Sequence, residues 1–401
     1  MEKQTTKRIN TDAYRTQSVI CPMNMPPIEG VSVIGADIGY SSVKVVTDNK
    51  YAIIPSHIRR VNEEDLAMRS PRDTDILYRG RDGVTWAVGE LAYEIGSSDS
   101  EVDSEVAMFG RSWCSTSRYR ILVDTGIGIS LCGNENGGPD KNNEIRVVTG
   151  LPPKYMTKSE KDEVANAFSN DGEQHEYYLK IGKGQWSAYR YYINKRNVQV
   201  ISQPHGALFC ASITPDVKMS DIARRILTGT VGIIDGGFGT LDFCGIKDAV
   251  TFQKETFPQR GMREIYLRTC KGISERYGKD IQVTELQNIL SSGQISVVDR
   301  KTLTRRTYHI DDILEESVNS VFDDAIRDIL DATKFLESYN LLIGTGGEFD
   351  AWESILKDKL SAMEIPIISA NRNLSGIPNT VSNAFGYYLY LKKQLINKSV
   401  G

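Results

Sequence analysis

The stretch Val231-Gly-Ile-Ile-Asp-Gly-Gly-Phe-Gly-Thr-Leu-Asp-Phe243 decides the fold, because it reads as a buried strand, a glycine-rich turn and a second strand. An earlier stretch, Ile34-Gly-Ala-Asp-Ile-Gly39, again ends an apolar strand in an acid followed closely by glycine. The two acids, Asp37 and Asp235, are 198 positions apart, which is too far for a short solenoid repeat. The duplication predicts two similar α/β domains whose turns line a shared cleft. Ligands of α/β proteins commonly bind in such clefts.

Further strands and helices are expected on either side of these turns. Alternating or continuous apolar runs predict strands, and apolar positions at helical spacing predict helices. The expected strands cover residues 43–47, 51–55, 144–153, 199–204 and 340–344, and the expected helices begin near 121 and 206 and cover 260–278, 311–337 and 383–395.

Two segments lie outside this pattern. Residues 1–29 are polar and predict a flexible N-terminal arm, either solvated or in contact with a partner. Residues from about 55 to 120 are charged and irregular, which predicts a small inserted subdomain.

Composition excludes several classes of protein. The 401 residues are 40% hydrophobic and 25% charged, with a net charge of -4, so a dedicated nucleic-acid surface is not expected. Neither a signal peptide nor a run of 18 apolar residues is present, which predicts a cytoplasmic protein without a membrane span. Six cysteines and four histidines lack the spacing of a metal knuckle, so reduced thiols are expected.

The first turn has the residues needed to hold a phosphate. Gly39 allows a sharp reversal, backbone N–H groups and hydroxyls follow at its tip, and a lysine adds a positive charge. Because a carboxylate repels phosphate, Asp37 needs a cation between them, and a hydrated Mg²⁺ meets that need. An ordinary hairpin is the alternative for this turn taken alone. The predicted nucleotide-binding residues here are Asp37, Gly39, Tyr40, Ser41, Ser42 and Lys44.

The second turn repeats this chemistry. Its glycines permit close backbone approach, Thr240 supplies a hydroxyl, and Asp235 is expected to share the Mg²⁺ with Asp37, through water in both cases. We predict a catalytic role for Asp235 and a lesser role for Asp242. The remaining predicted nucleotide-binding residues of this turn are Gly236, Gly237, Gly239 and Thr240.

A third glycine turn follows a later strand. Its residues, from Gly344 through Thr345, Gly346 and Gly347 to Glu348, allow a flat group to lie against bare backbone near a helix N-terminus. A lone glycine turn is a weak signal, and its weight comes from its place as the third of a set. Arg263 and Glu264 open a helix after the second turn and are predicted to reach the base or ribose, with exposed helix charges as the alternative.

Gln203 ends a strand between the first two turns. A glutamine side chain can orient a water through its amide but cannot accept a proton as a base, which matches the water-positioning glutamine of some nucleotide hydrolases. We therefore predict a catalytic role for Gln203. A polar turn residue is the alternative, and His205 is expected to be structural or exposed.

Taken in order, these motifs resemble those of the actin-like ATPase superfamily, which includes actin, chaperone ATPases, sugar kinases and bacterial actins. The likeness spans roughly residues 31–395, and Ser202–Ala207 and Asn379–Gly386 resemble its two connecting helices. Val148–Tyr155 and the Pro55-Ser-His-Ile loop look most like plasmid-segregation actins of the ParM type. Gln203 stands where many of these carry glutamate, although actin also uses glutamine, and the arm at 1–29 is an addition.

The resemblance implies an actin-like α/β fold of two similar domains, each with a mixed five-stranded sheet flanked by helices and with the nucleotide between them. Domain I would cover 30–205 and 380–401, and domain II 206–379. The implied function is an ATPase that binds ATP or ADP with Mg²⁺ and polymerises head to tail into filaments for plasmid DNA segregation. A centromere-binding adaptor would link the filament to DNA. GTP is the alternative nucleotide.

Other functions stay open at this point. A cytoskeletal filament without a segregation role fits the same motifs, and the shape-determining kind would carry an apolar membrane-binding feature that the arm lacks. A small-molecule kinase of this fold would need a carboxylate base where Gln203 stands. A chaperone-type ATPase would continue into a substrate-binding domain.

Overall fold

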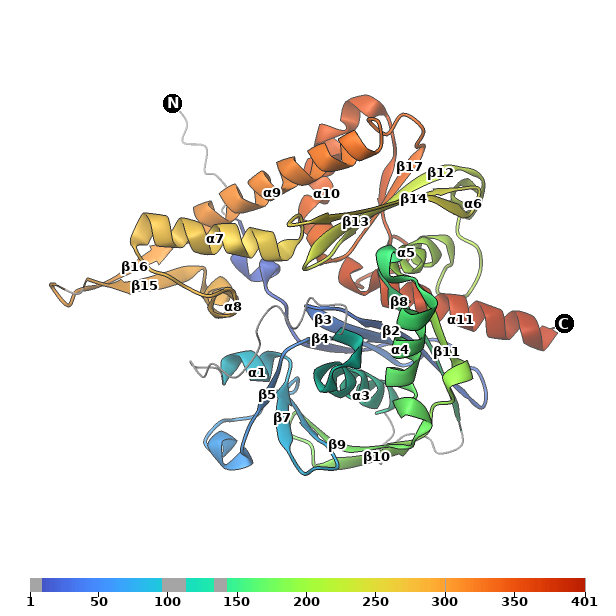
Figure 1. Cartoon of the computed structure of the whole chain (residues 1–401), viewed down its shortest axis with the longest axis horizontal. Helices are drawn as coiled ribbons and strands as arrows, with labels where there is room; N and C mark the ends of the chain where they lie inside the picture. Colours follow the sequence, from blue (N-terminus) through green and yellow to red (C-terminus); the bar gives the residue numbers. More distant parts are fainter. Residues whose placement is uncertain (1–8, 96–112, 133–142, 300, 401) are drawn as a thin grey trace. The chain divides into compact units, whose positions relative to one another are not determined.

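The computed structural model describes residues 9–95, 113–132, 143–299 and 301–400 (Figure 1). The chain forms two compact units, a larger one of residues 17–236, 242–256 and 338–401 and a smaller one of 1–16, 237–241 and 257–337. These units do not follow the domain boundaries predicted from the sequence, which stay a prediction. No helix in the described ranges has both the length and the apolar character needed to cross a membrane.

The first sheet of the larger unit carries the first acid-and-glycine turn. Its six strands run in the order β1-β4-β3-β2-β8-β11, with antiparallel pairs on the β1 side and parallel pairs where β8 joins β2 and β11. The strands are β1 (Val19–Pro22), β2 (Val31–Ile38), β3 (Ser42–Val46), β4 (Lys50–Pro55), β8 (Glu144–Leu151) and β11 (Val198–Ser202). The last six residues of β2 are all buried, as expected for a central strand covered on both faces.

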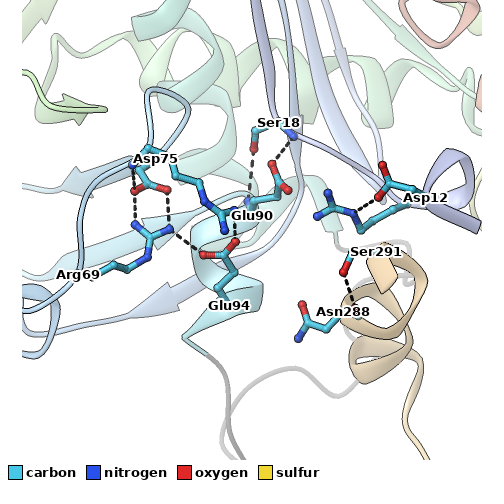
Figure 2. Close-up of polar contacts among 10 residues, drawn as sticks. Asp12, Ser18, Arg69, Asp75, Glu90, Glu94, Asn288 and Ser291 are labelled. Carbon is cyan, nitrogen blue, oxygen red and sulfur yellow. Dashed lines mark hydrogen bonds and ion pairs between the residues drawn. The ribbon is translucent and has the colours of Figure 1, made fainter. Parts of the chain in front are cut away.

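Strand β1 corrects the prediction of a flexible arm over residues 1–29. Val19–Pro22 pair antiparallel with β4 and make this sheet six-stranded rather than five-stranded. The backbone N–H of Ser18 donates to Glu90 Oε2 at 2.9 Å (Figure 2), and Lys392 Nζ donates to the carbonyl oxygen of Pro26. The arm prediction is therefore wrong for this part, while residues 1–8 lie outside the described residues.

A second sheet, ordered β10-β9-β6-β7-β5, forms the subdomain predicted at about 55–120. The prediction is incomplete, because two of its strands come from beyond residue 170. Within it, Arg69 Nη2 donates to Asp75 Oδ1 at 3.1 Å and to Glu94 Oε2 at 2.7 Å, as Figure 2 shows. Its elements are β5 (Ile58–Arg60), β6 (Ile76–Arg79), β7 (Thr85–Val88), α1 (Glu90–Glu94), β9 (His175–Ile181) and β10 (Ser187–Tyr191).

Helix α3 (Ser117–Leu131), which begins near the end of that predicted subdomain, packs on the first sheet against β2, β3 and β4. Thr116 caps its N-terminus by accepting from the N–H of Tyr119 at 3.1 Å. A Cβ on Gly126 would come within about 3 Å of Val43 and Val45, so this glycine allows the close packing. Helix α4 (Lys158–Phe168) contacts α3 and β11.

The third sheet carries the second and third turns in the order β14-β13-β12-β17-β18. Strand β17 pairs in parallel with both β12 and β18. The strands are β12 (Thr230–Gly236), β13 (Thr240–Lys247), β14 (Val250–Pro258), β17 (Leu341–Thr345) and β18 (Ile367–Ser369).

Two helices connect the first and third sheets within the larger unit. Helix α5 (Gln203–Ser212) contacts β12 and β17, and α11 (Ser382–Val400) contacts β2. The two helices pack so closely that a Cβ on Gly386 would lie 1.8 Å from the carbonyl oxygen of Gly206. Helices α6 (Ala223–Thr228) and α10 (Gly347–Lys359) complete this part.

The smaller unit is mostly helical. Helices α7 (Met262–Tyr277), α8 (Val283–Ser292) and α9 (Asp311–Ala332) bury amphipathic faces, and strands β15 (Gln294–Val298) and β16 (Arg305–His309) form an antiparallel hairpin. Gly278 ends α7 in the left-handed conformation that glycine adopts without strain.

Candidate functional site

Asp37 lies near the end of β2 and is buried, with 4% of its surface exposed. Lys44 is its partner across the antiparallel pair, and Lys44 Nζ lies 3.2 Å from Asp37 Oδ2. The strand register therefore places the predicted phosphate-binding lysine directly beside the predicted acid, and neither charge is buried without a counter-charge.

The turn between β2 and β3 is tight. The N–H of Gly39 donates to the carbonyl oxygen of Ser42 at 3.1 Å, and a Cβ on Gly39 would lie 3.0 Å from Lys44 Nζ. Ser56, which directly follows β4, stabilises the turn, because its hydroxyl donates to Gly39 O at 2.6 Å and its N–H donates to Ser41 O at 2.8 Å. Ser42 Oγ is buried with no hydrogen-bond partner in the part of the chain that the structure describes. Such an unpaired hydroxyl suits a polar ligand at this turn.

Tyr40 packs inward at the same turn. Its ring lies 5.9 Å from that of Trp113, and burial raises the pKa of its hydroxyl to about 12. The structure thus gives Tyr40 a packing role, and its predicted contact with a nucleotide stays a prediction.

Gln203 is the first residue of α5, directly after β11 ends at Ser202. Pro204 favours a helix start there, since its ring fixes φ and it has no N–H to satisfy. Gln203 Nε2 donates to Asp37 Oδ1 at 3.3 Å. This contact fixes the amide and leaves its carbonyl oxygen able to accept a hydrogen bond from another group.

Asp235 lies near the end of β12 and is 9% exposed. Burial, together with the negative charges of Asp242 and Asp37, raises the pKa of its carboxyl to about 7. A hydrogen bond from Asn383 Nδ2 at 2.9 Å and the charge of Lys44 act in the opposite direction. The two predicted acids therefore share one electrostatic environment within the larger unit.

The third turn is packed too closely for side chains at two of its glycines, Gly344 and Gly346. A Cβ on Gly344 would lie 1.9 Å from the ring of Phe349, and a Cβ on Gly346 would lie 2.2 Å from the carbonyl oxygen of Gly236. Gly346 also has a φ of 89°, where other residues are strained. The turn thus lies against the end of β12, with Thr345 Oγ1 donating to Asn383 Oδ1 at 3.5 Å.

Glu348 is 1% exposed in the first turn of α10 and lies beneath Gly236. Neither of its carboxylate oxygens has a hydrogen-bond partner among the described residues. Burial raises the pKa of Glu348 well above its ordinary value, and the charge of Asp235 raises it further. The carboxylate of Glu348 is thus buried against Gly236, and its predicted contact with the nucleotide stays a prediction.

The remaining predicted residues lie in the smaller unit. The turn at Gly237–Thr240, which includes Gly239, is held at the start of α7, where the N–H of Arg263 donates to the carbonyl oxygen of Phe238 at 2.8 Å. Glu264 Oε1 accepts from Arg268 Nε at 3.0 Å, so its carboxylate already has an ion-pair partner.

Two residues near the acids were missed by the sequence analysis. Asn383 binds Asp235, and Tyr387, one helical turn further along α11, has a buried hydroxyl with no hydrogen-bond partner in the described ranges. Burial raises the pKa of Tyr387, and the charges of Asp37 and Asp235 raise it further. The sequence from Asn379 to Gly386 predicts a connecting helix, but it does not show which of its side chains contacts Asp235.

Among the residues that the structure describes, no group of three or more His, Cys, Asp or Glu side chains is placed to hold a metal ion. The residues present still fit a cation held through water, because the negative charges of the buried carboxyls of Asp37 and Asp235 repel each other and the single positive charge of Lys44 offsets them in part.

Residues 35–206 match the family described as "Actin like proteins N terminal domain". A comparison with curated protein sequences finds no match. Among solved structures, a 15-stranded ParM filament from Clostridium botulinum is similar with a TM-score of 0.65 and 20% identity, over 93% of this chain and 100% of that chain.

Two further solved structures have the same fold. The apo ParM protein of pSK41 matches with a TM-score of 0.61 and 15% identity, over 93% of this chain and all of that one. An archaeal actin homologue in complex with ADP matches with a TM-score of 0.61 and 15% identity, over 90% of this chain and 99% of that one. The chain therefore has the actin-like fold, and its residues 35–206 are similar to the N-terminal domain of actin-like proteins.

Proposed function

We propose that this protein binds ATP with Mg²⁺, hydrolyses it, and assembles head to tail into filaments that segregate plasmid DNA. The observation that carries the proposal is the arrangement of Asp37, with Lys44 at 3.2 Å on one carboxylate oxygen and Gln203 at 3.3 Å on the other. It joins a phosphate-binding charge, a metal-binding acid and a water-orienting amide in one place.

Phosphate binding is supported by the turn after β2. Lys44 supplies a positive charge, the turn supplies backbone N–H groups, and Ser42 supplies a hydroxyl without a partner among the described residues. Mg²⁺, when bound, would neutralise the phosphates and Asp37 and Asp235 together, through water. Charges in a buried site interact strongly, and the charge of Asp37 acts on Asp235, so these two carboxyls favour a cation. The nucleotide is ATP or ADP in this proposal, with GTP as the alternative.

Hydrolysis is assigned to Gln203. Its amide nitrogen is held by Asp37, so its carbonyl oxygen is free to orient a water for attack without taking the proton. Asp235 assists as the second acid of the site.

Filament formation is supported by fold similarity to a ParM filament from Clostridium botulinum. In the proposal, ATP favours assembly and hydrolysis weakens the contacts between subunits. A centromere-binding adaptor connects the filament to plasmid DNA in the cytoplasm, with no membrane involved.

Sedimentation tests the proposal. Purified protein should pellet with Mg²⁺ and ATP or a non-hydrolysed analogue, and much less with ADP. Asp235→Ala should abolish phosphate release while leaving the thermal unfolding transition cooperative. A protein that never pellets with any nucleotide, or an Asp235→Ala variant with unchanged phosphate release, would contradict the filament and the site assignments respectively.

A further inference from the structure

The β15–β16 hairpin of the smaller unit has a fixed base. Ile295 is 2% exposed, and its cross-strand partner Tyr308 stacks on Tyr277 with the ring centres 4.4 Å apart. Lys279 Nζ donates to the carbonyl oxygen of Ser296 at 3.1 Å. These contacts hold the start of the ribbon against α7 and α8, and the ribbon then extends past α8 (Figure 1).

The tip of this hairpin presents an apolar side chain. Leu303 is 80% exposed and has a φ of 54°, in the left-handed region that is unfavourable for a leucine. Hydrogen bonds nevertheless restrain the described residues beside it, because Asp299 Oδ1 accepts from the N–H groups of Lys301 at 2.8 Å and Thr302 at 3.2 Å. Val298, 46% exposed, adds a second apolar side chain beside the turn.

Positive charges surround this apolar tip. Lys301, Arg305 and Arg306 are exposed, and none has an ion-pair partner within 4.0 Å in the described ranges. In the sequence, residues 294–309 hold four cations, because Arg300 joins these three, and one carboxylate, Asp299, so their net charge is +3. Since the whole chain carries -4, the rest of it sums to -7. The hairpin is therefore complementary in charge to the remainder of its own chain.

We propose that this hairpin is a docking element for a second copy of this chain. Leu303 is the apolar anchor, and Lys301, Arg305 and Arg306 pair with carboxylates of that copy. An apolar centre with a polar rim is the usual composition of a protein interface. A two-stranded ribbon is only marginally stable alone, so docking would also stabilise it.

A second copy fits better than DNA for two reasons. DNA would use the positive charges but not the exposed leucine, and Asp299 at the turn would repel the phosphates. The proposal rests on the self-assembly proposed above and names the surface that takes part in it.

The test compares two variants with wild type in sedimentation with Mg²⁺ and ATP. Leu303→Ser and the double variant Arg305→Glu with Arg306→Glu should raise the concentration needed for pelleting at least roughly tenfold, which equals about 1.4 kcal/mol of contact energy. Nucleotide binding and the unfolding temperature should stay at wild-type values, because these side chains lie at an exposed tip. Met68→Ser is the matched control for loss of an exposed apolar group, and Lys247→Glu with Lys271→Glu is the control for charge.

Each outcome decides the proposal. If wild type pellets and the hairpin variants pellet equally well, the docking role is wrong while the filament proposal stands. If wild type stays monomeric in sedimentation velocity with every nucleotide, both are wrong. If pelleting is unchanged but the double variant loses binding to a random 40-base-pair DNA duplex, the hairpin is a DNA contact instead.

Discussion

Asn383 Nδ2 donates to Asp235 Oδ2 across 2.9 Å, which connects the start of α11 to the end of β12. Asn383 also accepts from Thr345 Oγ1 at 3.5 Å, so one amide joins the second and third glycine turns. This contact favours the charged form of an acid whose burial favours the neutral form.

Asn383→Ala should move the acid limb of the phosphate-release pH profile to higher pH. The lost hydrogen bond lowers the pKa of Asp235 in wild type, so its removal raises that pKa above about 7. The variant should also lose about 1–3 kcal/mol of stability, because a buried acceptor loses its donor. Phosphate release measured from pH 5.5 to 9 checks the shift.

Asn379→Ala is the matched control for that experiment. Asn379 is also buried next to α11, but it donates to the carbonyl oxygen of Gly344 at 3.2 Å and not to Asp235. A comparable loss of stability with an unchanged pH profile is expected. Identical profiles for both variants would show that Asn383 does not tune Asp235.

Asp235→Asn should stabilise the nucleotide-free protein at pH 8, and this gain should shrink as the pH falls and vanish below pH 4. The folded pKa of about 7 lies above the ordinary value of 3.8, so stability from this group is complete below pH 4 and is lost as pH rises to 7. The difference of about three pKa units corresponds to at most about 4 kcal/mol. Thermal unfolding in the presence of EDTA measures it, and an equal unfolding temperature for variant and wild type at pH 8 would exclude a raised pKa.

Gln203→Ala should slow phosphate release roughly 10- to 100-fold while changing nucleotide affinity much less, since the amide acts on the water and not on the ligand. Single-turnover hydrolysis and nucleotide titration separate the two effects. Gln203→Glu is a useful second variant, because glutamate has the same side-chain length as glutamine but places a negative charge beside Asp37 Oδ1. A loss of affinity alone in Gln203→Ala would remove the water-positioning role.

Lys392→Met should destabilise the protein by at most about 3–5 kcal/mol, because it leaves the partly buried carboxylate of Asp48 without its ion-pair partner at 2.8 Å. Lys392 also donates to Pro26 O, so the segment before β2 should become sensitive to proteolysis. Limited digestion and urea unfolding measure both effects. The neighbouring Lys393→Met is the control, since Lys393 makes long contacts with Val217 O at 3.4 Å and Met219 Sδ at 3.3 Å and has no ion pair among the described residues. Equal losses in both variants would argue against a special role for Lys392.

The sequence could predict the central elements because their signals are local. Strands β2 and β12, each followed by an acid-and-glycine turn, and helices α7, α9 and α11 all lie where apolar spacing predicts them. It could not predict β1, whose residues 19–22 follow a polar stretch and pair with a strand about thirty positions away. The subdomain sheet was likewise incomplete, because β9 joins β6 across about a hundred residues.

The sequence by itself determined the three turns, because an apolar strand, an acid and a glycine restrict the backbone over a few residues. Only the tertiary structure decided what surrounds them. It placed Asn383 on Asp235, Gln203 on Asp37 and Glu348 beneath Gly236. Those contacts depend on packing between distant segments, and the raised pKa of Asp235 depends on burial that no local pattern records.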